Sequence, residues 1–449
     1  LADENTSMGA HWRSNYHRSV GKHKIGKGKK AYWVAEVHRH NGKTYQFNQT
    51  ADGLWLGDPD VSDYLEETAS GWRYITRHGV VEIYGESGRL SKIVNSNGHE
   101  HYLQYDGVGK LRQIQDEFGR SLVIEYSADD LVQTVKDPAG SVYRYAYDQA
   151  GNLSRVTYPD ASTRHYLYEN PAYPHALTGI IDENGQRYAT WVYDDAGRAI
   201  HSEHAQGSDA VDISFQADGK RTVTDASGSV STYQVVSLHG TAKVVQLARE
   251  KCADCGIAFS KQASYDSNGY PKYRVDADGN ETAFYYNDRG LLESKISDFG
   301  SAQEQRTGII WHSRFNVPVA VRKEASSTYY AYDQRGKLRQ KRQTDNASGV
   351  SRTWTYTYSD KGLLASVDGP RTDVNDVTTY SYYPDGNLAS IANPVYTEIT
   401  YLSYDAFGRP LEQLDANGVL TRLEYDSRGR LIGSETDGEL TLFRYDNAG

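Results

Sequence analysis

The chain has 449 residues and a formal net charge of −10, and it contains 37 Tyr and 41 Gly although only 38% of its residues are hydrophobic. Disordered chains are poor in aromatic and β-branched residues, so this composition excludes general disorder. No apolar run reaches the roughly 18 residues that cross a bilayer, and two cysteines exclude a disulfide scaffold. The acidic balance counts against a nucleic-acid surface, so we expect neither a membrane span nor a nucleic-acid partner.

Residues 1–78 are expected to form an N-terminal β region that leads into the rest of the chain. Residues 1–10 have neither a basic start nor an apolar stretch, so no secretory signal is visible. A basic stretch at 13–43 stands out from the acidic chain and includes Lys22 and Lys24. It is compatible with a nucleic-acid or acidic-partner surface, but we favour a solvated loop between strands.

Residues 79–449 repeat a short motif, Tyr-Asp followed by Gly three residues after the Asp. The motif occurs eight times, against roughly 0.4 matches expected by chance, and several copies are 21 residues apart. We expect a loop insertion around 240–262, where the period is interrupted. The motif residues predicted to have a structural role are Tyr105, Asp106, Gly109, Tyr147, Asp148, Gly151, Tyr193, Asp194, Gly197, Tyr265, Asp266, Gly269, Tyr332, Asp333, Gly336, Tyr404, Asp405, Gly408, Tyr425, Asp426 and Gly429.

Each repeat is predicted to contain two strands and two turns. A second turn signal of the type Asp-x-x-Gly lies about halfway between motifs, as at Asp116 and Asp415. An Asp side chain accepts backbone N–H bonds in such turns, and Gly supplies the positive φ. Between the turns, Tyr143, Tyr145 and Tyr147 alternate with other residues, which places three rings on one face of a strand.

A hairpin of this kind is marginal alone, so the units are expected to pair edge to edge in one sheet. About 35 strands at about 4.8 Å each would make a sheet on the order of 170 Å long. Open sheets of more than about ten strands curl or split. We therefore predict an all-β chain whose long antiparallel sheet spirals into a wall or shell, which can be open in this fragment.

The motif resembles the YD repeats of bacterial Rhs proteins, also found in insecticidal toxin complexes and animal teneurins. The resemblance rests on units such as Tyr147–Leu153 and Tyr425–Leu431, with the sequence Tyr-Asp-x-x-Gly-x-Leu. The segment 9–16, with Gly-x-x-Trp-Arg, is similar to the part that precedes the repeats in Rhs proteins. The resemblance implies a hollow β-shell that encloses a C-terminal toxin domain, and delivery out of a bacterial cell through a secretion apparatus. The self-cutting segment and the toxin of that family are not found within these 449 residues.

Cys252 and Cys255 are the most distinctive residues outside the repeats. A zinc site needs four ligands, and the chain has no second Cys pair. A local disulfide or paired thiols that fasten a loop, inert thiols, and a metal or redox role all stay open, in that order of preference. No cofactor is implied.

Other groups of polar residues have ordinary structural explanations that we prefer. His99 with His101, and His201 with His204, lack a third ligand at a readable spacing, so solvated histidines are favoured over metal ligands. Asp276 begins a segment similar to a calcium loop, but it coincides with a mid-repeat turn and lacks the Glu that such a loop needs. The Asp-Pro-Ala-Gly segment at Asp137 is interpreted as a turn, not as a self-cleavage site.

These patterns favour a structural protein over an enzyme. The sequence contains no His-Glu-x-x-His, no Gly-x-Ser-x-Gly and no P-loop, so no catalytic and no metal-binding residues are predicted. We expect a toxin-enclosing shell for competition between bacteria or attack on a host. The alternative is a surface module in which tyrosine rows and the rings of Trp55, Trp72 and Trp191 bind glycans.

Overall fold

The computed structural model describes residues 5–28, 31–249, 259–394 and 397–449. Within these residues the chain is almost entirely β-strand, and it contains no α-helix. One 3-10 turn, η2 (Ala205–Gly207), lies between two strands. The prediction of an all-β chain is confirmed.

The N-terminal region is built of short strands. A two-stranded hairpin of β1 (Asn5–Thr6) and β2 (Gly9–Ala10) precedes the main sheet. The following strands are β3 (Ser19–Ile25), β4 (Tyr32–His38), β5 (Thr44–Gln49), β6 (Trp55–Gly57), β7 (Tyr64–Thr68), β8 (Gly71–Ile75), β9 (Val81–Gly85) and β10 (Leu90–Val94).

The repeats then follow as alternating strands and tight turns. They form β11 (Glu100–Tyr105), β12 (Leu111–Asp116), β13 (Ser121–Tyr126), β14 (Val132–Lys136), β15 (Val142–Tyr147), β16 (Leu153–Thr157), β17 (Thr163–Leu167), β18 (Gly179–Ile181), β19 (Arg187–Tyr193), β20 (Ala199–His204), β21 (Val211–Phe215), β22 (Lys220–Asp225), β23 (Val230–Leu238) and β24 (Thr241–Arg249). Residues 241–249 and 259–262, within the expected insertion, lie in strands β24 and β25, and 250–258 lie outside the described residues.

The last part of the chain continues in the same way to its end. Its strands are β25 (Phe259–Tyr265), β26 (Pro271–Val275), β27 (Glu281–Tyr286), β28 (Leu292–Ser297), β29 (Gln305–Trp311), β30 (Pro318–Lys323), β31 (Ser326–Tyr332), β32 (Leu338–Asp345), β33 (Ser351–Tyr358), β34 (Leu364–Asp368), β35 (Thr378–Tyr382), β36 (Leu388–Asn393), β37 (Thr397–Tyr404), β38 (Pro410–Leu414), β39 (Leu420–Tyr425), β40 (Leu431–Thr436) and β41 (Glu439–Leu442).

The strands β3 to β41 form one continuous antiparallel sheet of 39 strands, in which each strand pairs with the next one along the chain. Among the described residues, β41 pairs only with β40, and β3 pairs with β4 and otherwise makes one isolated bridge, Ser19 to Arg89. The two ends of the sheet are not joined to each other, so the spiral is open. The long spiralling antiparallel sheet predicted from the repeat is therefore confirmed.

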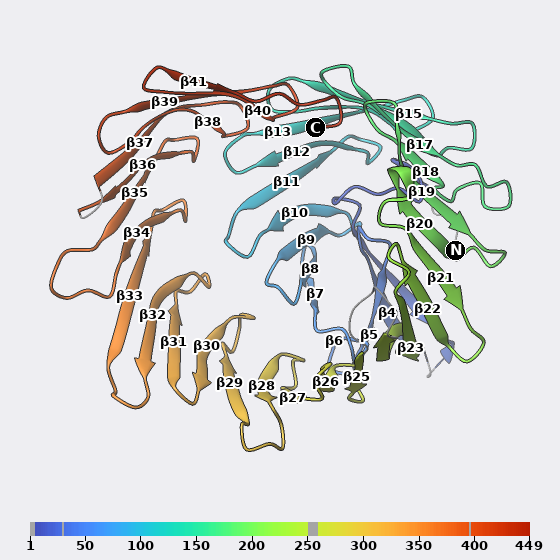
Figure 1. Cartoon of the computed structure of the whole chain (residues 1–449), viewed down its shortest axis with the longest axis horizontal. Helices are drawn as coiled ribbons and strands as arrows, with labels where there is room; N and C mark the ends of the chain where they lie inside the picture. Colours follow the sequence, from blue (N-terminus) through green and yellow to red (C-terminus); the bar gives the residue numbers. More distant parts are fainter. Residues whose placement is uncertain (1–4, 29–30, 250–258, 395–396) are drawn as a thin grey trace.

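A β-bulge beside each motif tyrosine explains why the sheet curls. The pairing register shifts between Ala146 and Tyr147, between Ala331 and Tyr332, and at equivalent positions of most other repeats. A bulge bends its strand and increases the local right-handed twist. Because the bulge recurs once per repeat, the bends add up and the sheet coils, as Figure 1 shows for the ring of strands.

The face that carries the motif tyrosines, called the tyrosine face below, is the concave face of the coil. Phe47 of β5 packs on Tyr74 of β8 with ring centroids 6.2 Å apart, although two strands lie between them. Strands that are not neighbours meet only on the concave side of a curled sheet. The buried core of the N-terminal strands continues on this same face into Leu103, Ile114 and Ile124 of the repeats.

The basic stretch at 13–43 does not form the loop that its composition favoured. Residues 19–25 and 32–38 are the paired strands β3 and β4. Lys22 lies over the rings of Trp55 and Trp72 at 5.5 and 5.8 Å and pairs with Glu67 at 2.7 Å. The loop prediction was wrong because Val20, on the same side of β3 as Lys22, and its partner Val37 of β4 pack into the core, which a count of charges ignores. Lys29 and Lys30 lie outside the described residues.

Candidate functional site

The repeat motif forms a turn that is linked by hydrogen bonds to the preceding hairpin. In the repeat at Tyr147, the phenol donates to the carbonyl oxygen of Val132 at 2.9 Å. Asp148 accepts the backbone N–H groups of Ala150 and Asn152 at 2.9 Å each through Oδ1. Gly151 has a φ of +81°, a left-handed conformation that favours glycine. The tyrosine thus connects neighbouring hairpins, and Asp and Gly shape the turn.

Nearly all predicted motif residues make the same contacts. Each of the seven predicted aspartates accepts two backbone N–H bonds within its turn, and each of the seven glycines has a positive φ. The phenols that donate to a backbone carbonyl oxygen earlier in the chain are those of Tyr105, Tyr147, Tyr193, Tyr265, Tyr332 and Tyr404. Tyr425 differs, since its ring packs under the Arg409 guanidinium at 4.4 Å.

Burial and hydrogen bonding also shift the acidity of these groups. Burial raises the pKa of Tyr105, Tyr332 and Tyr404 to about 12. The backbone N–H of Lys110 lowers the pKa of the Asp106 carboxyl. The phenols are therefore held as neutral donors and the carboxyls as charged acceptors.

A seam forms where a second winding of the sheet meets the first. Lys337, in the turn after β31, donates to the carbonyl oxygen of Asn97 in the turn after β10, at 3.2 Å and 240 residues away. The Asn316 side chain donates to the carbonyl oxygen of Arg77 at 3.4 Å, 239 residues away. The Arg120 guanidinium donates to the carbonyl oxygen of Phe407 at 3.3 Å, 287 residues away. Turns at the facing edges of the two windings therefore pack against each other. One winding takes 21 strands from β10 to β31 and 25 strands from β12 to β37.

The most buried contact of the seam is an ion cluster around Glu183. The Glu183 side chain has no exposed surface and lies 3.0 Å from both Arg164, on its own winding, and Arg428, on the other. Arg428 also lies over the ring of Tyr158 at 4.2 Å. Burial alone would raise the pKa of Glu183, but its backbone N–H bond and the two guanidinium groups lower it. A buried carboxylate is stable only when it is paired in this way, so the cluster fixes the relative position of the windings.

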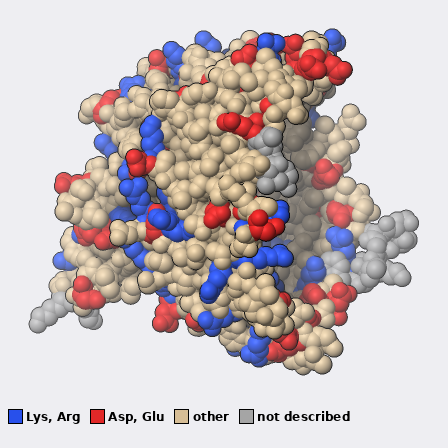
Figure 2. Space-filling model, turned by 90° about the vertical axis from the view of Figure 1, so that its left-hand side faces the viewer, with Lys and Arg blue, Asp and Glu red and all other residues tan. Residues whose placement is uncertain are grey.

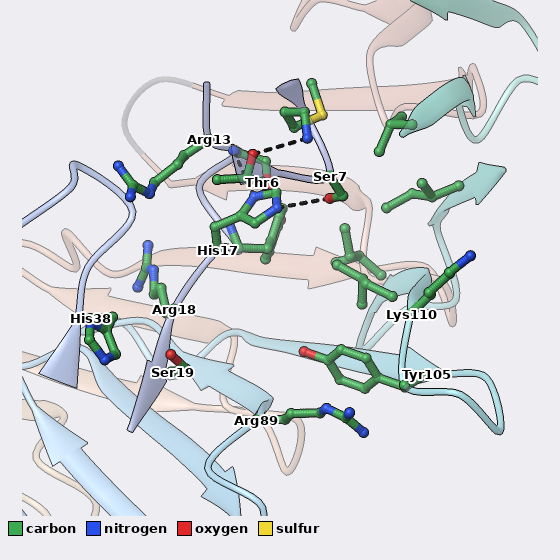
Figure 3. Close-up of a pocket in the computed structure, with 18 of the residues that line it drawn as sticks. Thr6, Ser7, Arg13, His17, Arg18, Ser19, His38, Arg89, Tyr105 and Lys110 are labelled. Carbon is green, nitrogen blue, oxygen red and sulfur yellow. Dashed lines mark hydrogen bonds between the residues drawn. The ribbon is translucent and has the colours of Figure 1, made fainter. Parts of the chain in front are cut away.

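A pocket of about 1140 Å³ lies on the tyrosine face, between the N-terminal segment, the turn that joins β4 to β5, and strands β11 to β15. Residues 5–18 cross this face, held by the bonds from Val132 N–H to the Ser7 oxygen at 2.7 Å and from the Trp12 indole to Tyr168 at 2.7 Å. The floor is apolar and includes Ile114 and Ile124. Figure 3 shows Arg18, Arg89, Lys110 and Tyr105 around the opening.

Ser7 and His17 meet in this pocket, but their hydrogen bonds oppose nucleophilic catalysis. His17 Nε2 lies 2.9 Å from Ser7 Oγ, as Figure 3 shows. His17 Nδ1 accepts the backbone N–H of Ser14 at 2.9 Å. Burial, with the charge of Arg13, lowers the pKa of His17. The neutral ring therefore carries its proton on Nε2 and cannot take the proton of Ser7. The pair fixes the path of the N-terminal segment.

A buried ion network lies beside the pocket and holds the core together. Glu82 is fully buried on β9, and Arg39 donates to it at 2.8 Å from the turn between β4 and β5. Arg18 and the Tyr84 phenol also donate to Glu82. Burial would raise the pKa of Glu82, but these donors lower it. The sequence gives no signal for this network, because Arg39 and Arg18 precede Glu82 by 43 and 64 residues.

The histidine pairs singled out in the sequence each find separate partners. His99 Nδ1 lies 2.6 Å from Glu117, whereas His101 meets the Tyr16 phenol at 3.4 Å. His201 pairs with Asp212 at 2.7 Å, and the ring of His204 stacks on Tyr188. Within the described part of the chain, no three His, Cys, Asp or Glu side chains are grouped so that they could hold a metal ion.

The remaining candidates are turns or lie outside the described residues. Asp276 accepts the N–H groups of Asp278 and Asn280 at 2.9 Å, and Asp137 accepts those of Ala139 and Ser141 at 3.0 and 2.9 Å. Both are the Asp-centred turns that the sequence suggested. Cys252 and Cys255 lie outside the described residues, so the thiol prediction stays open.

The aromatic platform of the glycan-binding alternative is not present as expected. Trp55 and Trp72 are 4% and 5% exposed, and they pack on each other with ring centroids 5.2 Å apart. Trp191 is only partly exposed. Two of the three rings are therefore core residues, and most motif phenols are engaged with backbone carbonyls. No helix in the described residues has the length and apolar character to cross a bilayer.

Comparisons with known proteins point to one family. The family model described as RHS Repeat matches residues 126–163 and 404–441. The chain is 24% identical over 438 residues to double-stranded DNA deaminase toxin A of Burkholderia cenocepacia, covering 90% of this chain and 28% of that protein. It is 24% identical over 370 residues to the probable deoxyribonuclease RhsB of Dickeya dadantii, covering 81% and 21%.

A solved structure shows the same fold. The Photorhabdus luminescens Tc holotoxin pore matches with a TM-score of 0.51 and 13% identity over 94% of this chain and 23% of that chain. The chain spans about a quarter of the length of these proteins.

Proposed function

Since the chain is an Rhs-repeat protein, we propose that it forms part of a shell that encloses a C-terminal toxin domain and helps to deliver it out of a bacterial cell. Its role in this proposal is structural. The enzymatic activity would belong to the enclosed domain, as the names of a DNA deaminase toxin and a probable deoxyribonuclease suggest for relatives.

The seam between the windings is the observation that supports this proposal most directly. A sheet that only curled would leave gaps between its windings, whereas here turns about 240 residues apart bond to each other. With 21 to 25 strands per winding and about 4.8 Å per strand, the circumference is roughly 100 to 120 Å, which corresponds to a diameter of roughly 30 to 40 Å between backbones.

We also propose that residues 1–78 and 79–449 have different roles in the shell. The N-terminal strands supply eight of the fifteen buried residues of the hydrophobic core cluster, whereas the repeats supply the regular wall. The ladder is continuous across the boundary, since β8 pairs with β9 along its whole length, from Gly71 opposite Gly85 to Ile75 opposite Val81. The N-terminal region would then close one end of the coil without a hinge between the two parts.

Protease protection tests the proposal. The full-length gene product that contains this chain, with its C-terminal domain inactivated, is treated with a protease and compared with the isolated C-terminal domain. We expect the enclosed domain to be cleaved at least tenfold more slowly than the isolated one. Equal cleavage rates would refute enclosure.

Small-angle X-ray scattering of residues 1–449 tests the coil separately. A hollow coil gives a larger radius of gyration than a solid particle of the same mass. A radius equal to that of a solid sphere of 50.3 kDa would contradict the open spiral.

A further inference from the structure

One sector of the tyrosine face is strongly basic, although the chain as a whole carries a net charge of −10. The sector comprises strands β22 to β33. Its cations occupy strand positions on the same side as the motif tyrosines Tyr265 and Tyr332, as the pairing registers establish from strand to strand. They are Arg221, Arg249, Lys261, Arg274, Lys295, Lys323, Lys341 and Arg352.

Aromatic residues alternate with these cations along the sector. Lys341 is directly opposite Trp354, with its ammonium 4.8 Å from the ring centroid. Lys295 is opposite Phe284, and the Arg274 guanidinium lies 5.4 Å from that same ring. The rings support the long side chains and leave the charged groups facing the concave side.

Few acidic groups compensate for this charge. Among the strand residues of β22 to β33, the acidic positions on the tyrosine face are Asp225, Glu293 and Asp345. Asp225 and Asp345 lie at strand ends, and Glu293 is the extra residue of the bulge beside Tyr286. Asp225 lies 3.5 Å from Arg249. Lys295, Lys323 and Arg352 have no ion pair among the described residues.

The basic character belongs to this sector and not to the whole wall. On the tyrosine face of β34 to β41, the described strand positions contain no Lys or Arg. Figure 2 shows the side of the molecule on the left of Figure 1, where Lys and Arg are interspersed with Asp and Glu. A concave surface lined by charges of one sign concentrates its field on whatever lies inside the coil.

We propose that this sector, β22 to β33, is a docking surface for an acidic surface of the enclosed protein domain. The inference rests on the proposed function, because the concave face would surround that domain. Charge complementarity selects an acidic partner. The position on the inside of the coil, facing the proposed cargo, favours a protein over a nucleic acid.

The two faces of the same strands offer a matched test. A tyrosine-face triple variant replaces Arg221, Lys323 and Lys341 with Gln, and a convex-face triple variant replaces their sequence neighbours Lys220, Arg322 and Arg342 with Gln. Both remove three positive charges from the same strands. The probe is fluorescently labelled poly-L-glutamate, whose binding to residues 1–449 is followed by fluorescence anisotropy at 50 mM salt.

We expect the tyrosine-face triple to weaken poly-L-glutamate binding at least tenfold and the convex-face triple by less than twofold. Circular dichroism checks that both variants keep their strands. Equal weakening by both triples would overturn the proposal, because only net charge would then matter. Tighter binding of single-stranded (dT)20 than of poly-L-glutamate, with the same dependence on the tyrosine face, would overturn it in favour of a nucleic acid.

This measurement needs no enclosed domain, so its failure is distinguishable from failure of the enclosure proposal. Loss of protease protection with a preserved face dependence would refute enclosure and leave an acidic-ligand surface. Protection without face dependence would support enclosure and refute this docking surface.

Discussion

Replacing Arg428 with Met should loosen the seam locally and leave the rest of the wall intact. Arg428 is 13% exposed, donates to the fully buried Glu183 at 3.0 Å and covers the ring of Tyr158. A hydrogen bond to a charged group contributes about 1.5–3 kcal/mol. Glu183 keeps Arg164 as a partner in the variant, so we expect a loss near the lower half of that range, about 2 kcal/mol.

Hydrogen exchange followed by mass spectrometry measures this loss. If strands β39 to β41 open from the first winding before they unfold, about 2 kcal/mol corresponds to roughly 30-fold faster exchange of their amides. Arg422→Met is the matched control, because Arg422 lies on β39 but is 54% exposed and pairs with Glu412 within the same winding. Exposed pairs contribute about 0–1 kcal/mol, so the control should accelerate exchange by no more than about fivefold.

The comparison between the two variants decides whether the seam carries stability. Acceleration confined to β39–β41 and clearly larger in Arg428→Met than in Arg422→Met agrees with a fastened second winding. Equal, small effects in both variants would refute it, since the contacts between windings would then contribute nothing measurable.

Three further predictions concern single residues. Gly279→Ala should lower the free energy of unfolding, measured by urea titration, by about 1–2 kcal/mol, because the φ of Gly279 is +88°. Gly308→Ala is the control and should not destabilise the protein, because Gly308 lies in a strand with open space around it. Similar losses at both sites would contradict the turn geometry. The Asp212 carboxylate raises the pKa of His201, so an NMR titration should give this histidine a pKa above 6.5, and Asp212→Asn should lower that pKa. The stability that the charged pair contributes is present at low pH and is lost as pH rises through the folded-state pKa of His201. Burial raises the pKa of Tyr105 to about 12, so an ultraviolet titration should show a phenol that ionises well above pH 10. The stability that the protonated phenol contributes is lost as pH rises toward 12. Ionisation near pH 10 would argue against the buried hydrogen bond of Tyr105.

The sequence was most informative where the structure is local. The turns at Asp148 and Gly151 could be predicted because both requirements, an acceptor for backbone N–H groups and a positive φ, belong to a few consecutive residues. The same holds for the alternating strand at Tyr143 to Tyr147. The bulge beside Tyr147 was not predicted, because two-residue alternation gives no sign of where an extra residue enters a strand.

Composition misled where burial depends on the other strands. Lys22 suggested a solvated loop, yet it lies on β3 over buried tryptophans. Trp55 and Trp72 suggested an exposed platform for sugars, yet they form part of the core. In both cases the side chain is surrounded by residues of strands that lie tens of residues away in the sequence. The local sequence pattern contains no information about those residues.

By itself the sequence determined the repeat, its Asp and Gly turns, the antiparallel sheet and the need for that sheet to coil, since all four follow from short-range backbone geometry repeated many times. Only the tertiary structure decided which face is concave, how many strands make one winding and which turns meet at the seam. These properties depend on small bends that accumulate over more than 20 strands and on contacts between residues about 240 positions apart, such as Lys337 and Asn97. They also decide that the cations from Arg221 to Arg352 gather on one inner sector, although along the chain they look like ordinary scattered charges.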